Sequence, residues 1–533
     1  MTVHYRPKGP SMPQADSHRW VQTVTLPPPS LADNSADANR LEAVLKQSLG
    51  VPTVAMDLDQ LKSLPEQLRE WHFRATAVVF KETAAKGVLI HLAPPDTTER
   101  LCGLAVDLGT TRVVLRIIDL VSGEHLAETV FDNPQTTVGP DVLTRIHHVE
   151  TPGGLDRLHR LIIDGINAQV EGLCRRCAIG TGQIHLVSVA GNTAMTHLLL
   201  GLNPRWMIRE PYIPVTNRPG VVRAAQPGLS VHPNARMLVF PNVGSYFGGD
   251  LIAGILHCDM DRREETAILV DVGTNAEVVL GNRHWMMACA GAAGPALEGG
   301  VTRMGTTAGP GVIDRIAIDP DTLAFDVRTI ENQPPRGICG SGVIDLAAAL
   351  FRSGMIDIRG KLIPERCGKR YSLQNGLAHL TVVPAGQSAT GHDLGITQAD
   401  LDSLIRSKAA MYTILETITG SVGMQQSDLT TFFVAGTFGA YIDPVSAITV
   451  GMIPDLPIEY YRSLGNSSLG GATRVLQDPG CFDRIDAIRD SITYMELNVN
   501  QDFMNRFSAA KFLPHTDTAR FPSVRVPSGR STQ

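Results

Sequence analysis

Two short segments of the chain carry residue types that could bind a phosphate and its metal ion. Asp107-Leu108-Gly109-Thr110-Thr111 follows an apolar run, and so does Asp271-Val272-Gly273-Thr274-Asn275. A strand that ends in Asp and turns at Gly directs backbone N–H groups and hydroxyls toward an anion, and the carboxylate suits a hard metal ion. Each segment then resumes as a strand. Two such hairpins, 164 residues apart (271 minus 107), predict a duplicated lobe with a nucleotide phosphate clamped between the halves.

These residues can be given roles in phosphoryl transfer, which needs mainly positioning, a metal ion and an oriented nucleophile. Asp107 is the preferred candidate for holding Mg²⁺, through water, and Asp271 for orienting the attacking water. The two assignments could be exchanged. The candidates for the phosphate oxygens, with the two turn glycines, are Gly109, Thr110, Thr111, Gly273, Thr274 and Asn275.

A third segment predicts contact with the nucleoside. Gly436-Thr437-Phe438-Gly439 follows the apolar run Thr431–Val434 and precedes an expected helix. Backbone N–H groups at the carboxyl end of such a strand face the ligand crevice, and glycines let a ribose or base lie on bare backbone. The alternative is an ordinary tight turn between strand and helix. The two hairpins favour the nucleoside interpretation.

Two further turns are less specific. Gly340 and Ser341 open a helix and could cap a phosphate, although a hinge where two helices cross closely is the favoured role. Asn192 follows the buried strand His185–Ala190 and could orient a water molecule. Asn is also a common cap at the start of a helix, and this structural role is the more frequent one.

The cysteines and histidines give no metal-binding pattern. Cys174 and Cys177 form the only CxxC pair, and a zinc or iron–sulfur site needs a second pair at suitable spacing. We therefore expect a structural role for this pair. The histidines, including His147-His148, show no ligand spacing and are expected to be ordinary surface or core residues.

Composition restricts the class of protein. The chain has 533 residues, 43% of them hydrophobic, and a net charge of −6, which argues against nucleic-acid or anionic-membrane partners. No apolar run approaches the roughly 18 residues of a membrane span, and the N-terminus has no secretion signal. Eight unevenly spaced cysteines in so long a chain suit a reducing cytoplasm. We therefore expect a cytoplasmic globular protein.

Periodicity of apolar residues divides the chain into six expected segments. They are a disordered N-terminus (1–22), a Pro-rich linker (23–36), a small α+β module (37–98), two lobes (99–236 and 237–514) and a loose tail (515–533). Helices are expected at 37–49, 57–71, 152–176, 193–200, 342–353 and 398–419. Strands are expected at 73–80, 87–92, 101–107, 112–119, 126–132, 185–190, 267–271, 276–280 and 431–434. Strands followed by helices, twice, predict a duplicated α/β lobe.

The phosphate hairpins, the connecting glycine turns and the Gly-Thr-Phe-Gly turn resemble the actin-like superfamily of acetate and sugar kinases, heat-shock chaperones and actin. Longer motifs narrow the resemblance to the reductive activators of corrinoid proteins, and it covers about residues 25 to 514. The segments that carry it are Leu26–Ser30, Asn133–Gln135 with Gly139–Ile146, Asp271–Glu277, Cys289–Gly299, Gly337–Asp345 and Gly451–Pro457.

This resemblance implies an ATPase that returns an inactive Co(II) corrinoid methyltransferase protein to Co(I), and it suggests a homodimer. Well-known members carry an iron–sulfur domain, or a clustered-Cys domain at the C-terminus. Here the first cysteine is Cys102 and the last is Cys481, so no cluster is expected. Electrons would come from a separate ferredoxin or flavodoxin. The alternatives are a nucleotide-dependent docking or chaperone factor without electron transfer, and a small-molecule kinase of the same fold.

Overall fold

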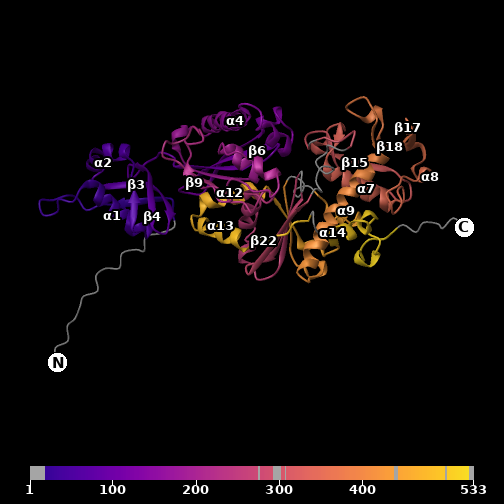
Figure 1. The fold of residues 1–533 in the computed structure, drawn as a ribbon. Helices are drawn as coiled ribbons and strands as arrows, with labels where there is room; N and C mark the ends of the chain where they lie inside the picture. The colour runs from indigo at the N-terminus through magenta and orange to yellow at the C-terminus, as the bar shows by residue number, and fades with distance from the viewer. Residues whose placement is uncertain are drawn as a thin grey trace. The chain divides into compact units, whose positions relative to one another are not determined.

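The computed structural model describes residues 19–273, 276–291, 302–306, 308–436, 442–497 and 501–526. The chain divides into two compact units, each with its own core (Figure 1). Described residues 19–253 and 468–487 form the first unit, and the remaining residues, from 254 onward, form the second. None of the helices in these ranges combines the length and the apolar character that crossing a membrane requires.

The first unit begins with a small α+β module. Its sheet has the strand order β1-β3-β4-β2, and two helices pack their leucines on it. The elements are β1 (Val21–Thr25), α1 (Asp37–Leu49), β2 (Thr53–Ala55), α2 (Leu58–Glu70), β3 (Arg74–Thr83) and β4 (Lys86–Ala93). Both predicted helices and both predicted strands are confirmed.

The rest of the first unit is built on a six-stranded sheet of order β7-β6-β5-β8-β10-β9. Strands β5, β8 and β10 are parallel, and β5, β6 and β7 form an antiparallel meander. The strands are β5 (Cys102–Leu108), β6 (Arg112–Asp119), β7 (His125–Asp132), β8 (Ile184–Gly191), β9 (Gly220–Arg223) and β10 (Arg236–Val239).

Helices cover both faces of this sheet. The apolar face of α4 packs on one side of β5 to β7, while α12 and α13 lie on the other (Figure 1). The side chain of Leu476 on α12 fills the space beside Gly103 on β5. The helices are α3 (Val142–His148), α4 (Gly154–Cys177), α5 (Thr193–Leu199), α6 (Gly249–His257), α12 (Ser467–Gln477) and α13 (Gly480–Ser491).

The second unit repeats this plan, which confirms the duplicated actin-like lobe. Its strand order β13-β12-β11-β20-β21 matches β7-β6-β5-β8-β10 with the same strand directions. The 24-residue helix α9 (Gln398–Ser421) packs on β12 and β13 as α4 packs on β6 and β7. The strands are β11 (Ala267–Val272), β12 (Ala276–Asn282), β13 (Trp285–Gly291), β20 (Phe432–Ala435), β21 (Tyr461–Gly465) and the edge strand β22 (Ile492–Tyr494).

The second unit also contains elements that the first lacks. Two three-stranded sheets, β15-β14-β16 and β17-β18-β19, occur between β13 and α9. The added elements are β14 (Val312–Ile318), β15 (Phe325–Thr329), β16 (Gly337–Ile338), α7 (Gly340–Arg352), α8 (Pro364–Cys367), β17 (Tyr371–Gln374), β18 (Leu377–Val383) and β19 (Leu394–Thr397). Two short helices follow later in the chain, α11 (Pro444–Thr449) and α14 (Gln501–Phe507).

Two expected segment boundaries fall inside strands of the structure. The expected linker 23–36 and N-terminus 1–22 miss β1, and Trp20 is buried, with its indole Nε1 donating to the Val475 carbonyl at 3.1 Å. The expected lobe boundary at residue 237 falls inside β10, which pairs with β8 of the first lobe. An apolar run at this position could end the first lobe or begin the second, so the sequence alone did not show to which lobe β10 belongs.

The expectation of a loose tail after residue 514 is wrong for the residues described there. Phe521 is 1% exposed, and its ring lies 5.3 Å from that of Tyr412 on α9. Arg520 pairs with Glu416 at 2.6 Å, and the Ser523 hydroxyl donates to Asp455 at 2.8 Å. The polar composition of this segment suggested solvent exposure, but Arg520 and Ser523 bind side chains of the second unit.

Candidate functional site

The first predicted hairpin lies where parallel strands end. Asp107 near the end of β5 is level with Ala190 on β8, and Gly191 and Asn192 follow directly. The carboxyl ends of parallel strands are where α/β sheets bind ligands. The structure therefore brings two separately predicted elements, the hairpin and the Asn192 turn, to one edge of the first sheet.

The turn itself is held by several hydrogen bonds. A Cβ on Gly109 would lie 2.3 Å from the Arg112 carbonyl oxygen, so only glycine fits. The Asn133 amide donates to the Gly109 carbonyl at 2.9 Å, and the buried Arg145 donates to the Thr110 carbonyl at 2.6 Å. Thr111 is exposed next to them. These contacts fix the backbone that the sequence predicts to face a phosphate.

Asn192 combines the two roles considered for it from sequence. Its Oδ1 accepts the Met195 N–H at 3.0 Å, so it is the N-cap of α5. Its Nδ2 donates to the hydroxyl of Thr110 at 3.0 Å. Asn192 therefore couples the start of a buried helix to the hairpin.

An Asn192→Ala variant should lose about 1–2 kcal/mol of unfolding free energy, because a cap and a side-chain bond disappear together. Nucleotide affinity should fall as well, since the Thr110 hydroxyl is no longer held. Denaturant unfolding and nucleotide titration measure the two effects. Asn192→Ser is the matched control, because Ser also caps helices but cannot reach Thr110. Equal nucleotide affinity in Asn192→Ala and wild type would contradict the coupling.

Asp107 lies among polar groups that the sequence did not single out. The Ser468 hydroxyl on α12 donates to its Oδ1 at 2.8 Å. Asp250 at the start of α6 lies near it, and burial together with the Asp107 charge raises the pKa of Asp250 well above the usual range of a carboxyl group. Two neighbouring carboxylates repel each other, and a divalent cation would relieve that repulsion. The donor set thus fits Mg²⁺.

Sequence reasoning missed Asp250, although a signal was present. Gly248-Gly249-Asp250 opens a helix, like the other glycine turns. A Cβ on Gly248 would lie 2.5 Å from the Asn192 Cα and 3.0 Å from the Gly191 carbonyl oxygen. Gly248 is needed because the loop packs directly on the end of β8, and Gly249 because its backbone packs on Phe240.

The second hairpin has the same setting in the second unit. Asp271 on β11 is level with Ala435 on β20, and Gly436 follows with a φ of +80°. A Cβ on Gly436 would lie 2.7 Å from the Asp271 Oδ1. Gly273 lies in a bend of the backbone directly after β11. The predicted residues Thr274, Asn275, Thr437, Phe438 and Gly439 lie outside the described residues.

Gly340 and Ser341 begin α7, as expected. A Cβ on the next residue, Gly342, would lie 2.5 Å from the Ile313 carbonyl oxygen on β14, so the close approach is between helix and strand. The hinge role favoured for Gly340 and Ser341 stays a prediction. Ser341 is 6% exposed, and its hydroxyl lies 3.2 Å from the Cys339 sulfur.

Cys174 and Cys177 end α4, on the last turn of the helix. Burial raises the pKa of Cys174 to about 11, so its thiol is protonated at neutral pH.

A Cys174→Ser/Cys177→Ser variant should keep full activity and lose only about 1–2 kcal/mol of unfolding free energy, the cost of a buried hydroxyl. Parallel activity and unfolding measurements check this. Loss of activity in a folded variant would mean that the pair has a chemical role.

Family models match almost the whole chain. The model described as the linker region of RACo matches residues 14–99, and that of the RACo middle region matches 102–263. The model described as the C-terminal domain of RACo, the ASKHA domain, matches 265–525. These three segments follow one another without overlap.

Curated and solved proteins agree with the family models. The corrinoid activation enzyme RamQ of Eubacterium limosum is 30% identical over 428 residues, covering 79% of this chain and 72% of that protein. The [Co(II) methylated amine-specific corrinoid protein] reductase of Methanosarcina barkeri is 24% identical over 440 residues, covering 76% and 75%. A solved reductive activator for a corrinoid, iron–sulfur protein is 36% identical with a TM-score of 0.85, covering 95% of this chain and 81% of that one.

Proposed function

This chain belongs to the reductive activators of corrinoid proteins, and on that premise we propose that it spends ATP to return a corrinoid methyltransferase protein from Co(II) to Co(I). The reaction adds one electron to the cobalt of the partner protein while ATP is hydrolysed to ADP and phosphate. The observation that supports ATP use most directly is the pair of matching Asp hairpins, each at the carboxyl edge of its own sheet.

The residues around each hairpin fit the parts that phosphoryl transfer requires. In the first unit, Asp107 with the neighbouring Asp250 offers carboxylate oxygens for Mg²⁺, and Thr110 is held in place by Asn192. In the second unit, Asp271 is proposed to orient the attacking water. When bound, Mg²⁺ neutralises phosphate charge as the terminal phosphoryl group is transferred to water.

ATP is needed because Co(I) formation is uphill for ordinary biological electron donors. A nucleotide-bound activator that binds the partner better in one cobalt coordination state shifts the partner toward that state. The shift cannot exceed the difference in binding free energy between the two states. If the nucleotide changes the activator's affinity for its partner by some factor, thermodynamic linkage requires the partner to change the activator's affinity for the nucleotide by the same factor.

We propose that the electron comes from a separate low-potential protein, such as a ferredoxin or flavodoxin. A cluster needs about four thiolates close together. The eight cysteines all lie in described ranges and are all free, and six of them are buried. The metal-ligand groupings found in those ranges contain no cysteine.

An anaerobic visible spectrum tests the proposal. A corrinoid protein in the Co(II) state is mixed with this protein, a low-potential reductant and Mg-ATP. A Co(I) band that requires both the protein and ATP is expected. ADP in place of ATP, and an Asp271→Asn variant in place of wild type, serve as controls and should give no Co(I).

Two other outcomes reject the proposed reaction in different ways. A nucleotide-dependent change in the Co(II) band without Co(I) would identify a docking factor that does not deliver electrons. No spectral change with any corrinoid protein, together with ATP consumption that depends on a metabolite, would identify a kinase.

A further inference from the structure

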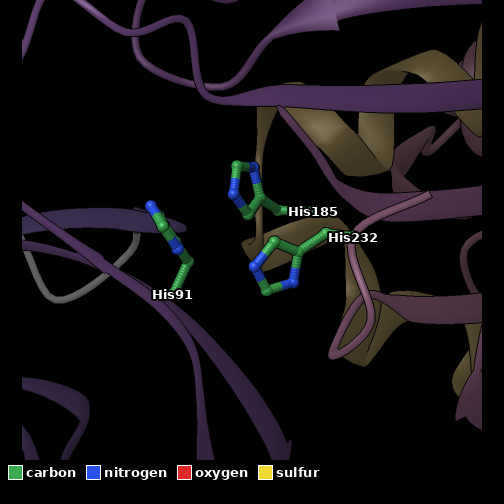
Figure 2. Close-up of side chains that lie close together, drawn as sticks. All are labelled: His91, His185 and His232. Atoms are coloured by element: carbon green, nitrogen blue, oxygen red, sulfur yellow. The ribbon is translucent and has the colours of Figure 1, made fainter. Parts of the chain in front are cut away.

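Three histidines far apart in the sequence meet in the first unit. His91 lies on β4 of the small module, His185 on β8 of the lobe, and His232 in the loop before β10. Figure 2 shows the three imidazoles gathered around one point. One ring nitrogen from each lies within 4.8 Å of the others. Intervals of 94 and 47 residues gave no sign of this cluster in the sequence.

A β-bulge places His185 there. The β5–β8 ladder pairs Cys102 with Ile184 and Gly103 with Leu186, so His185 has no partner on β5. Bulges re-aim one side chain at the cost of a local break in the ladder, and they are common beside functional sites. The extra residue at the start of β8 thus serves to direct this imidazole toward the other two.

The cluster leaves buried nitrogens without hydrogen bonds. His185 is 0% exposed, and neither of its ring nitrogens makes a hydrogen bond of ordinary geometry among the described residues, although the Gln183 backbone lies near the ring. The buried Nε2 of His91 lacks one as well. An unsatisfied buried polar group costs about 1–3 kcal/mol, and most have a partner in native proteins. Each neutral ring offers one lone pair, so a bound metal ion would satisfy Nε2 of His91 and one of the two nitrogens of His185.

Burial acts on the three rings in the same direction. Burial lowers the pKa of His185 to about 2 and that of His232 to about 4, and it also lowers the pKa of His91. Burial therefore disfavours the charged form of each ring. Tilted and edge-to-face packing of the rings, with centroids 4.8 to 5.2 Å apart, would account for their contact but not for the unpaired nitrogens.

We propose that His91, His185 and His232 bind a divalent transition-metal ion of the zinc class, which fastens the small module to the lobe. Imidazole is a common ligand for zinc, and three histidines leave a fourth position open to water. Ligand nitrogens of a tetrahedral zinc site lie about 3.3 Å apart, so the rings would move closer on binding.

Coordination also changes one hydrogen bond. The Nδ1 of His232 accepts the Asn234 N–H at 3.2 Å, while its Nε2 points toward the other rings (Figure 2). A metal on Nε2 places the ring proton on Nδ1, and the Asn234 contact is then lost. The loop before β10 should therefore report metal binding.

This site is separate from the nucleotide residues. His185 is the second residue of β8, whereas Asn192 follows the last one. Seven residues of extended strand span roughly 23 Å, so the histidines lie near the opposite end of the sheet. The metal would act on the contact between module and lobe. That contact also includes an ion pair of Asp57 with Arg223 at 2.5 Å.

Metal titration of the full-length protein tests the proposal without any corrinoid assay. Chelator-treated protein is titrated with Zn²⁺ in a calorimeter and with Co²⁺ in a spectrophotometer. One ion per chain is expected, with the strong visible bands of four-coordinate cobalt and a Zn²⁺-dependent rise in Tm. His91→Gln and His232→Gln should each weaken zinc binding by at least about 100-fold and remove the rise in Tm.

Two controls separate this site from adventitious binding. His147→Gln removes an exposed histidine elsewhere on the first unit and should bind zinc as wild type does. The partly exposed His91 and His232 carry the test, because a change at the fully buried His185 could prevent folding. Absence of stoichiometric binding would overturn the proposal. So would zinc binding that persists in both His91→Gln and His232→Gln, or cobalt spectra of a six-coordinate ion.

Discussion

An Asp271→Asn variant is expected to hydrolyse ATP at least about 10²–10³-fold more slowly than wild type while remaining folded. Asparagine keeps the shape of the side chain, which matters because the Gly436 backbone packs against the Asp271 carboxylate. It removes the negative charge that is proposed to orient the attacking water. Phosphate release in single-turnover conditions measures the effect, and unfolding curves confirm that the fold is intact.

The control for this variant is Asp402→Asn, the same chemical change on the surface of the second unit. Asp402 lies on α9 and pairs with Lys361 at 2.8 Å, partly exposed to solvent. Such surface pairs contribute little to stability. Wild-type hydrolysis by Asp402→Asn and loss in Asp271→Asn are expected. An unchanged rate in Asp271→Asn would remove this residue from the reaction.

An Arg145→Met variant should lose about 3 kcal/mol of unfolding free energy, the largest stability effect expected in the first unit. Arg145 is 0% exposed and donates to the carbonyl oxygens of Gly139 and Thr110, at 2.8 and 2.6 Å, and to Oε1 of Gln135 at 3.2 Å. Methionine fills the space but leaves these oxygens unpaired. Burial lowers the pKa of Arg145 to about 10, so the side chain is still charged at pH 7.

The same substitution should reach the nucleotide residues through Thr110. Once its carbonyl is released, the first hairpin loses a fixed position, and nucleotide affinity should fall in the variant even where it remains folded. Denaturant midpoints and nucleotide titrations measure the two effects. Arg157→Met, on the exposed side of α4, is the control and should change neither. Wild-type stability in Arg145→Met would show that these oxygens find other partners.

Local patterns were sufficient to predict the hairpin strands and the longest helices of the two lobes. The strands that lead into Asp107 and Asp271 are apolar runs that end at a glycine turn, and both begin and end within two residues of the predicted positions. The bounds of α4 and α9 were predicted to within two residues, α4 from its 3.6-residue period and α9 although most of its residues from Leu404 to Thr419 are buried. Duplication was visible because two such patterns recur in the same order.

What the sequence did not reveal depends on contacts between distant residues. Asp250 joins Asp107 only because the Gly248 loop packs on the end of β8. Phe521 is buried because Tyr412 lies opposite it, and the polar residues around Phe521 gave no such indication. His91 and His185 come from different sheets. The pattern of residues within a short segment contains no information about such contacts between distant parts of the chain.

The helices α12 and α13 belong to the first unit although they lie late in the chain, and this order affects folding during synthesis. Residues up to 253 emerge first, yet the helices that cover one face of their sheet emerge only with residues 468–487. At normal elongation rates the interval is roughly 10 to 50 seconds. During that time the space beside Gly103 lacks Leu476, and Asp107 lacks Ser468. Until then one apolar face of the first unit's sheet is uncovered, and Asp107 gains the Ser468 hydroxyl only after residue 468 has been translated.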